Sequence, residues 1–323
     1  MNAAEPRVRA DAVLRDQFKA YFRRRPIAEL RLDLQILEKA AHRADLSPAG
    51  CELASSEIRA AIEGARPFSL VRIGDGEGNV LAADDPDFPE LSRSCAGEIM
   101  RMMFGYGAIL PTSVMRVRQG LIEAIQEADI LGVSDSHRLD LMEARLAQPE
   151  TISDLRGLHG SAESIVRVKN ILLAARDNRV LAVTNHIHRF LASDYATILS
   201  ELDYIAYVAP YDLDAALSRR FGAPQVIGFR IPNQASNWIG VADRWYGSRF
   251  EQLIQDMRVP EGRGVFLVGA GLLGKAICTA VKRKGGVALD IGSMIDVWAG
   301  HSVRRYHDEA FLRQHALVAN VTA

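Results

Sequence analysis

The sequence predicts an α/β protein whose mostly parallel β-sheet carries helices on both faces. From Val114 onward, short runs rich in Val, Ile and Leu alternate with longer helical segments. Such alternation is typical of parallel strands that are buried on both faces. A hydrophobic share of 48% and a charged share of 24% over 323 residues are sufficient to bury a sizeable core. We find no internal repeat, low-complexity tract or interdomain linker.

We expect residues 1–48 to form a helical N-terminal extension, followed by a single α/β domain over residues 49–323. Apolar and aromatic side chains recur at helical spacing early in this extension: Val13, Leu14, Phe18, Tyr21 and Phe22. Pro26 ends the first helix, and a second is expected from Ile27 to His42. The basic side chains of the first helix could bring it to an anionic membrane surface. The other interpretations are docking on the domain or on a second copy of the chain, as in a homo-oligomer.

The expected elements of the α/β domain follow one another with short connections. They are helix 52–64, strand 68–73, helix 94–103, helix 114–128, strand 130–134, helix 162–176, strand 180–184, helix 187–201, strand 204–208, strand 225–231, helix 241–257, strand 265–268, helix 272–284 and strand 287–291. The segment 84–89 is expected to be a loop. Because open α/β sheets bind ligands at the carboxyl ends of their strands, we expect the functional side chains there.

An acidic turn follows the strand Phe68–Ile73. Gly74 ends this strand, and Asp75 and Glu77 stand on either side of Gly76. Carboxylates two residues apart on an extended or turning backbone project to the same side, and Gly76 allows other groups to approach closely. Two hard oxygen ligands beside a diphosphate suit Mg²⁺ or Mn²⁺. The alternative is that Asp75 or Glu77 only caps the following helix.

Arg72 immediately precedes the acidic turn. On a strand it alternates with Val71 and Ile73, so its guanidinium emerges among apolar neighbours, where an unpaired charge is costly. We expect its partner to be a phosphate or the acidic pair of the turn, because guanidinium groups bind both kinds of oxygen bidentately.

Two further strand ends carry polar residues. Asn185 and His186 follow the strand 180–184, and one or both are expected to contact a ligand bound at this edge. His186 and His188 could also ligate a metal, although an isolated His-x-His pair is a weak metal signal. Asp296 follows the last strand, where it could act as a base toward an acceptor hydroxyl or simply lie on a helix surface.

A Gly-rich turn from Gly269 to Gly274 follows a strand and opens a helix, and Asp290 stands about 20 residues later. This spacing matches the fingerprint of dinucleotide-binding domains, so an NAD(P)-binding oxidoreductase is an alternative function. About 33 residues follow Asp290, which is too few for the remaining strands of a six-stranded dinucleotide domain. We therefore expect Gly269 and Gly271 to bind phosphate at the helix start, or to permit tight helix–strand packing.

Composition limits the partners of the chain. A net charge of −1 gives no global attraction to nucleic acid, so no nucleic-acid partner is expected. The three cysteines form neither a disulfide framework nor a zinc spacing, which favours a reducing, cytoplasmic location. The sequence has no apolar run of the length of a transmembrane helix, and its first residues do not resemble a secretory signal.

The run LVRIGDGE, from Leu70 to Glu77, resembles the signature near the start of the GT-D-type glycosyltransferase domain, in which an Arg precedes a Gly-Asp-Gly-Glu turn with an Asp-x-Glu pair. The stretch from Val265 to Gly300 resembles the carboxyl end of that domain, with its Asp-Ile-Gly-Ser strand end and Asp-x-Trp segment. The two stretches stand in the order of the family and bracket most of the chain.

The resemblance implies a Rossmann-like fold and a metal-dependent enzyme that transfers a sugar from a nucleotide-diphosphate donor to a glycan or a protein-linked sugar. It implies Mn²⁺ or Mg²⁺ at Asp75 and Glu77, with Asp296 as the candidate catalytic base. The expected donor-binding residues are Arg72, Gly74, Gly76, Asn185, His186, Gly269, Gly271 and Asp290. A non-catalytic protein that binds nucleotide sugars on the same fold remains an alternative.

Overall fold

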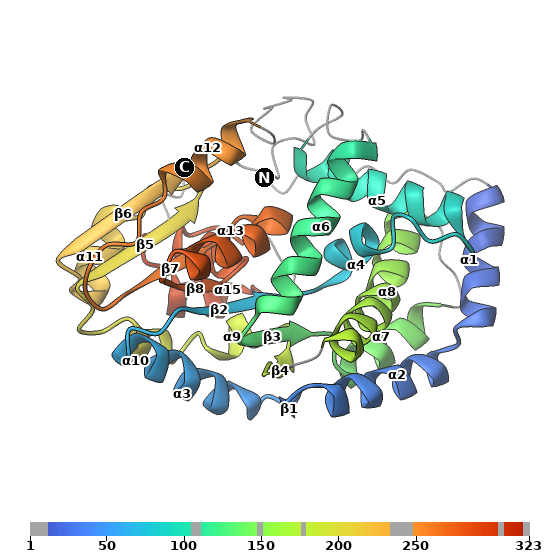
Figure 1. Ribbon diagram of the computed structural model, residues 1–323, viewed down its shortest axis with the longest axis horizontal. Helices are drawn as coiled ribbons and strands as arrows, with labels where there is room; N and C mark the ends of the chain where they lie inside the picture. Colours follow the sequence, from blue (N-terminus) through green and yellow to red (C-terminus); the bar gives the residue numbers. More distant parts are fainter. Residues whose placement is uncertain are drawn as a thin grey trace.

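The structure is a computed structural model that describes residues 12–104, 111–146, 151–175, 179–232, 248–302 and 307–318. Within these residues, eight strands form a single sheet in the order β1-β4-β3-β2-β8-β7-β5-β6 (Figure 1). Every neighbouring pair is parallel. The α/β, Rossmann-like fold expected from the sequence is therefore confirmed.

The strands are short, as expected for a parallel sheet. They are β1 (Arg43–Asp45), β2 (Phe68–Arg72), β3 (Ile130–Val133), β4 (Leu181–Thr184), β5 (Tyr204–Ala209), β6 (Gln225–Arg230), β7 (Gly264–Val268) and β8 (Val287–Asp290). All strands predicted from residue 68 onward are found within one or two residues of their expected bounds. Strand β1 was not expected, because its three residues are charged or small, carry no apolar pattern and lie within the predicted helical extension.

The helices of the described residues surround this sheet. They are α1 (Ala12–Arg24), α2 (Ile27–Ala40), α3 (Gly50–Glu63), α4 (Asp75–Leu81), α5 (Pro89–Phe104), α6 (Pro111–Glu127), α7 (Ser136–Arg145), α8 (Ile152–Ala174), α9 (Ile187–Phe190), α10 (Tyr195–Ile198), α11 (Asp214–Phe221), α12 (Ser248–Asp256), α13 (Gly271–Arg283), α14 (Met294–Trp298) and α15 (Glu309–His315). The helix expected over 187–201 is instead the two short helices α9 and α10, and the helix expected over 162–176 begins earlier, at Ile152. Helices α7, α11 and α15 were not predicted. Of the helix expected over 241–257, residues 241–247 lie outside the described part.

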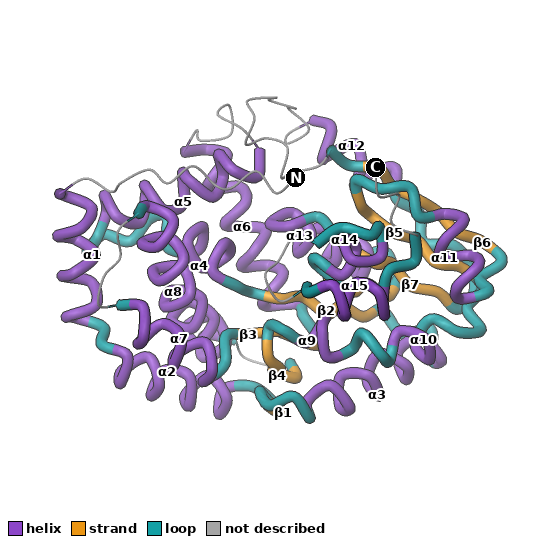
Figure 2. Tube along the Cα trace, turned by 180° about the vertical axis from the view of Figure 1, so that it is seen from behind, coloured by secondary structure: helices purple, strands orange, loops and turns teal. Residues whose placement is uncertain are grey.

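Alternate residues of the central strands enter two different cores. Val71 of β2 and Leu131 of β3 pack with residues of α6 and α13, whereas Leu70 and Ile130 pack with residues of α3 and α14. This period of two is what strands buried on both faces require. Figure 1 shows α6 and α13 over one face, and Figure 2 shows α14 and α15 over the other.

The strand order changes direction beside β2. The chain runs outward from β2 through β3 to β4, then continues at the opposite side of the sheet with β5 and returns to β2 only with β8. Leu70 of β2 lies opposite Leu289 of β8 and Ile130 of β3. In open α/β sheets such a switch point, at the carboxyl ends of the strands, is where ligands bind.

The helices expected in the N-terminal extension are present and pack on the rest of the chain. Leu14, Phe18 and Tyr21 of α1, with Leu30 and Leu34 of α2, share one apolar core with residues of α5, α7 and α8. Strand β1 then pairs with β4 at the edge of the sheet. The division into residues 1–48 and 49–323 remains a prediction, but α1, α2 and β1 all contact the α/β region directly.

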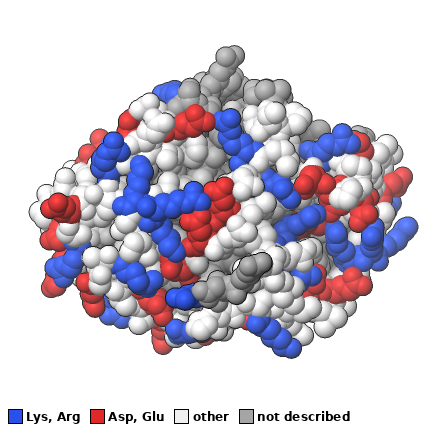
Figure 3. Space-filling model, viewed as in Figure 1, with Lys and Arg blue, Asp and Glu red and all other residues white. Residues whose placement is uncertain are grey.

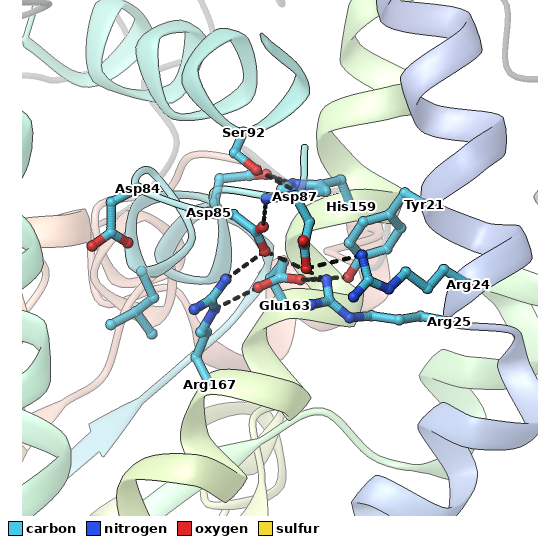
Figure 4. A network of polar contacts seen from close by, with 12 residues as sticks. Tyr21, Arg24, Arg25, Asp84, Asp85, Asp87, Ser92, His159, Glu163 and Arg167 are labelled. Atoms are coloured by element: carbon cyan, nitrogen blue, oxygen red, sulfur yellow. Dashed lines mark hydrogen bonds and ion pairs between the residues drawn. The ribbon is translucent and has the colours of Figure 1, made fainter. Parts of the chain in front are cut away.

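Buried charges join α1 to α8. On one carboxylate oxygen, Glu163 accepts hydrogen bonds from the Tyr21 hydroxyl at 2.6 Å and from Arg25 at 2.7 Å, and on the other it accepts from Arg167 at 2.6 Å (Figure 4). Arg25 and Arg167 also pair with Asp85. Two guanidinium groups therefore balance two carboxylates, which is the condition for burying charge at modest cost.

His159 extends this cluster toward the acidic turn. Its Nδ1 lies 2.8 Å from Oδ1 of Asn79, and Nδ2 of Asn79 donates to the carbonyls of Asp75 and Arg156. Because Nδ2 is the donor, Oδ1 is the acceptor, so the His159 proton is on Nδ1. Complete burial lowers the pKa of His159 to about 4, and its imidazole stays neutral above that pH.

We expect this histidine to make the fold less stable in acid. Between pH 6.5 and about 4 the unfolded chain binds a proton at His159 that the folded chain does not bind, so stability falls as the pH falls through this window. The full effect is roughly 3 kcal/mol, from a pKa difference of between two and three units. The measurement is urea unfolding against pH: His159→Gln should flatten the slope over this window, and the exposed His42→Gln should leave it unchanged. Equal slopes for both variants would contradict the prediction.

Candidate functional site

The acidic turn lies at the carboxyl end of β2. Gly74 precedes the first residue of α4, Asp75, and Glu77 stands in the first turn of this helix. The Glu77 carboxylate reaches back, and its Oε2 accepts the backbone N–H of Gly74 at 2.9 Å. Part of the alternative interpretation is therefore observed, because Glu77 caps the helix with one of its two oxygens.

Lys275 of α13 holds the other oxygen of Glu77. Its Nζ lies 2.6 Å from Oε1 of Glu77 and 3.1 Å from Oδ2 of Asp290, and it donates to the carbonyl of Gly271 at 3.1 Å. Its side chain is only 4% exposed. Lys275 was not predicted as a site residue, because a lysine in the first turns of a helix is ordinarily a solvated side chain.

Arg72 joins the ends of three strands. Its Nη2 pairs with Oδ1 of Asp290 at 3.2 Å and its Nε donates to the Asp290 carbonyl, both at the end of β8. Its Nη1 donates to the carbonyl of Asn185 at 3.0 Å and lies 2.7 Å from Nδ1 of His188, beyond β4. The structure pairs Arg72 with the carboxylate of Asp290, which was not the expected carboxylate partner, whereas a phosphate partner stays a prediction.

Arg72, Asp290, Lys275 and Glu77 thus form a buried chain of alternating charges at the switch point. Burial alone would lower the pKa of Lys275, but the Asp290 and Glu77 carboxylates outweigh it and the pKa is raised. Burial would likewise raise the pKa of Asp290, but Arg72 and Lys275 hold it below its usual value. Both groups therefore stay charged at neutral pH, and the four charges cancel.

Asp75 differs from Glu77 in its surroundings. Its carboxylate makes no hydrogen bond or ion pair with any described residue, and the residue is partly exposed. Its carbonyl is fixed by Asn79, which His159 orients in turn. Asp75 is thus the carboxylate of the acidic turn that is available to a ligand.

Two glycines place α4 directly on α8. A Cβ atom on Gly78 would lie 1.9 Å from the carbonyl oxygen of Gly160, and one on Gly160 would lie 2.0 Å from the carbonyl oxygen of Asp75. Only hydrogen fits at either position, so the backbone of α8 supports the backbone of the acidic turn. At Gly76 a Cβ would make only ordinary contacts with Ile99 and Leu272. Gly76 is therefore not needed for space in this arrangement.

Asn185, His186 and His188 lie at the end of β4. The Nδ2 atom of Asn185 would be 3.7 Å from a Cβ on Gly74, which puts this amide beside the acidic turn, and its Oδ1 is buried without a hydrogen-bond partner. Because Arg72 donates to Nδ1 of His188, the His188 proton is on Nε2. Burial, followed by the charge of Arg72, lowers the pKa of His188 well below its usual range. Burial also lowers the pKa of His186.

The Gly-rich turn has a packing role. A Cβ on Gly269 would lie 2.3 Å from the side chain of Ile295, and Gly271, with a φ of 51°, begins α13 in the left-handed region that favours glycine. Asp290, the acidic residue of the dinucleotide fingerprint, is 3% exposed and already paired with Arg72 and Lys275. It is therefore not free to bind a ribose, which weakens the oxidoreductase alternative.

Asp296 lies on α14, beyond β8. Its Oδ1 accepts a hydrogen bond from the hydroxyl of Tyr211, which follows β5, at 2.7 Å. The structure therefore joins Arg72, Asp290 and, through Lys275, Glu77 in one contact chain, with Asn185 attached through its carbonyl. Asp296 follows β8 on α14 and pairs with Tyr211 beyond β5.

Other candidate features lie elsewhere or are not found. A hollow of about 550 Å³ is lined by residues of α2, β1 and the start of α7, and none of the predicted site residues lines it. In the described part of the chain no three His, Cys, Asp or Glu side chains cluster as a metal site, and no helix there is long and apolar enough to span a membrane. Basic and acidic side chains are mixed over the face shown in Figure 3.

Comparison with known proteins gives one family and one solved structure. Residues 52–200 match the model of a GT-D-like family, described as a GT-D fold-like domain. A solved structure of a selenomethionine-substituted domain of unknown function 1792 is similar with a TM-score of 0.46 and 14% identity, over 86% of this chain and 93% of that one. No curated protein matches the chain. The family match includes the acidic turn and confirms the resemblance drawn from it; the stretch from Val265 to Gly300 lies outside the match.

Proposed function

We propose, from the GT-D-like domain over residues 52–200, that this protein is a glycosyltransferase that takes a sugar from a nucleotide-diphosphate donor. The observation that carries the proposal is the position of Asp75. It is an available carboxylate on the family's acidic turn, at the switch point of a parallel sheet. The acceptor class that this activity implies is a glycan or a protein-linked sugar.

The residues of the turn fit a divalent ion only in part. Asp75 offers an available carboxylate, whereas both oxygens of Glu77 are engaged by Gly74 and Lys275. Mg²⁺ and Mn²⁺ are often held by one carboxylate together with the phosphates of a substrate, so Asp75 alone is a sufficient protein ligand. When bound there, such an ion would neutralise charge on the diphosphate leaving group.

The remaining residues hold and orient the donor. The Asn185 amide, beside Gly74 and with an unpartnered Oδ1, is suited to a hydroxyl of the sugar or ribose. His186, at the same strand end, is a second polar contact. Arg72 and Asp290 keep the three strand ends together and so act on the donor through the shape of the site.

Asp296 is the base in this proposal. Its carboxylate, which accepts a hydrogen bond from the Tyr211 hydroxyl on Oδ1, would take the proton of an acceptor hydroxyl as that hydroxyl oxygen attacks the sugar. The three cysteines are all unpaired, which supports a reducing compartment such as the cytoplasm as the place of action.

Thermal shift is the direct test of donor binding. We expect UDP or GDP to raise the melting temperature more with Mn²⁺ than with EDTA, because a ligand that binds only the folded state stabilises it. NADH, measured in parallel, should give no shift. A saturable shift with NADH and none with either nucleoside diphosphate would replace the transferase proposal with the oxidoreductase alternative.

A further inference from the structure

We propose that Lys275 withholds Glu77 from the divalent ion, so that the ion binds at Asp75 only together with the donor's diphosphate. The first half of this inference concerns the free protein. The second half, the joint binding, rests on the proposed function.

The contacts of Glu77 leave no oxygen aimed at a ligand. Oε2 accepts from the backbone of Gly74 at 2.9 Å, and Oε1 lies 2.6 Å from Nζ of Lys275. The side chain is 12% exposed. To ligate an ion, Glu77 would have to release one of these partners or accept the cation beside the positive charge of Lys275, 2.6 Å from Oε1.

Lys275 is fixed in this position. Its ammonium forms ion pairs with the Glu77 and Asp290 carboxylates and donates a hydrogen bond to the carbonyl of Gly271. All three lie within 3.1 Å and the side chain is 4% exposed, so the ammonium depends on these protein partners. Removing Glu77 from it would leave a buried charge poorly compensated, which is strongly unfavourable.

The acidic turn therefore offers an ion one carboxylate instead of two. A single carboxylate is a weak site for Mg²⁺ or Mn²⁺, which fill their coordination shells with phosphate oxygens when these are present. Ion and diphosphate must then raise each other's affinity by the same factor, because coupling between two ligands is reciprocal. The expected consequence is a protein that holds little metal until the donor arrives.

The test is a titration of the full chain with Mn²⁺, followed by the electron paramagnetic resonance signal of the free ion. For the wild type we expect Mn²⁺ affinity to rise at least about tenfold when UDP or GDP is present, after correction for Mn²⁺ bound by the nucleotide alone. Asp75→Asn should abolish this rise. With Glu77→Gln, this rise in Mn²⁺ affinity should stay within about threefold of the wild-type rise, since an amide oxygen can still accept the Gly74 N–H.

Lys275→Met tests the withholding directly. It removes the ammonium from Oε1 of Glu77 and Oδ2 of Asp290, so the protein without nucleotide should bind Mn²⁺ at least about tenfold more tightly than the wild type. The double variant Lys275→Met, Glu77→Gln should lose most of this gain. Circular dichroism shows whether each variant is folded. If Lys275→Met does not fold, the inference is tested by comparing the Mn²⁺ titrations of the wild type and Glu77→Gln.

The outcomes separate the two proposals. Tight Mn²⁺ binding by the wild type without nucleotide, weakened tenfold by Glu77→Gln, would overturn the inference and leave the transferase proposal standing. A folded Lys275→Met that gains no affinity would also overturn it. A third outcome is that Lys275→Met raises Mn²⁺ affinity but nucleotides do not. Glu77 would then be withheld as inferred, and the proposal of a nucleotide-diphosphate donor would be wrong.

Discussion

Asp75→Asn should reduce hydrolysis of the sugar donor about a thousandfold, measured as release of the nucleoside diphosphate from UDP- or GDP-sugars. The loss corresponds to several kcal/mol of transition-state stabilisation from the ion that this carboxylate would hold. The substitution should have little effect on the stability of the fold. The Asp75 carboxylate contacts no described partner, so the free energy of unfolding should stay within about 0.5 kcal/mol of the wild type.

The contrast with two other acidic residues makes this prediction specific. Asp140→Asn removes an exposed carboxylate that pairs with Arg31 on the surface, and it should affect neither activity nor stability. Glu77→Gln should lower stability by about 1–3 kcal/mol, because the buried Lys275 ammonium loses one charged partner and keeps only Asp290 and the Gly271 carbonyl. Near-wild-type hydrolysis in Asp75→Asn would remove the acidic turn from the mechanism.

Gly160→Ala should cause the largest loss of stability, about 3 kcal/mol or more in urea unfolding. The added Cβ would lie 2.0 Å from the carbonyl oxygen of Asp75 and close to the Asn79 amide. Neither group can move aside without separating α4 from α8. Overpacking against backbone atoms is therefore expected to destabilise the fold strongly. Activity should fall with stability, since the acidic turn moves with α4.

Gly120→Ala is the matched control within a helix. Gly120 lies inside α6, and a Cβ there would meet only the Cβ of Ala276 at 3.5 Å, an ordinary contact. We expect this variant to be stabilised by about 0.5–1 kcal/mol, because alanine loses less backbone entropy than glycine in a helix. If both variants lose stability equally, the close contact between α4 and α8 would not explain the loss, since any glycine-to-alanine change within a helix would have the same effect.

The sheet could be predicted because its strands are buried on both faces. Such strands must be continuous apolar runs, and β2, β3, β5 and β7 are therefore visible in the sequence. Strand β1 lacks such a run and therefore could not be recognised in the sequence. Its residues Arg43–Asp45 lie at the sheet edge, half-buried at most, so they carry charge and leave no apolar pattern.

The site was harder to predict, since its contacts join distant parts of the chain. The position of the acidic turn at a strand end followed from local spacing. The partner of Arg72 did not, because Asp290 becomes its neighbour only when β8 pairs with β2. The spacing of Asp290 after Gly269 is the same for a carboxylate that binds ribose and for one that neutralises Arg72 and Lys275. Sequence alone cannot separate these roles.

The pairing of β2 with β8 also constrains how the chain folds as it is made. Arg72 and Asp290 are 218 residues apart, so a nascent chain has completed β2 long before its neighbour on that side emerges from the ribosome. Until then β2 presents an unpaired apolar edge, and Arg72 lacks its counter-ion. Closing so long a loop is slow, and exposed edges invite aggregation. The sheet and its site are therefore complete only after β8 has been synthesised. Intermediates formed before that point expose apolar surface, and we expect chaperones to bind them.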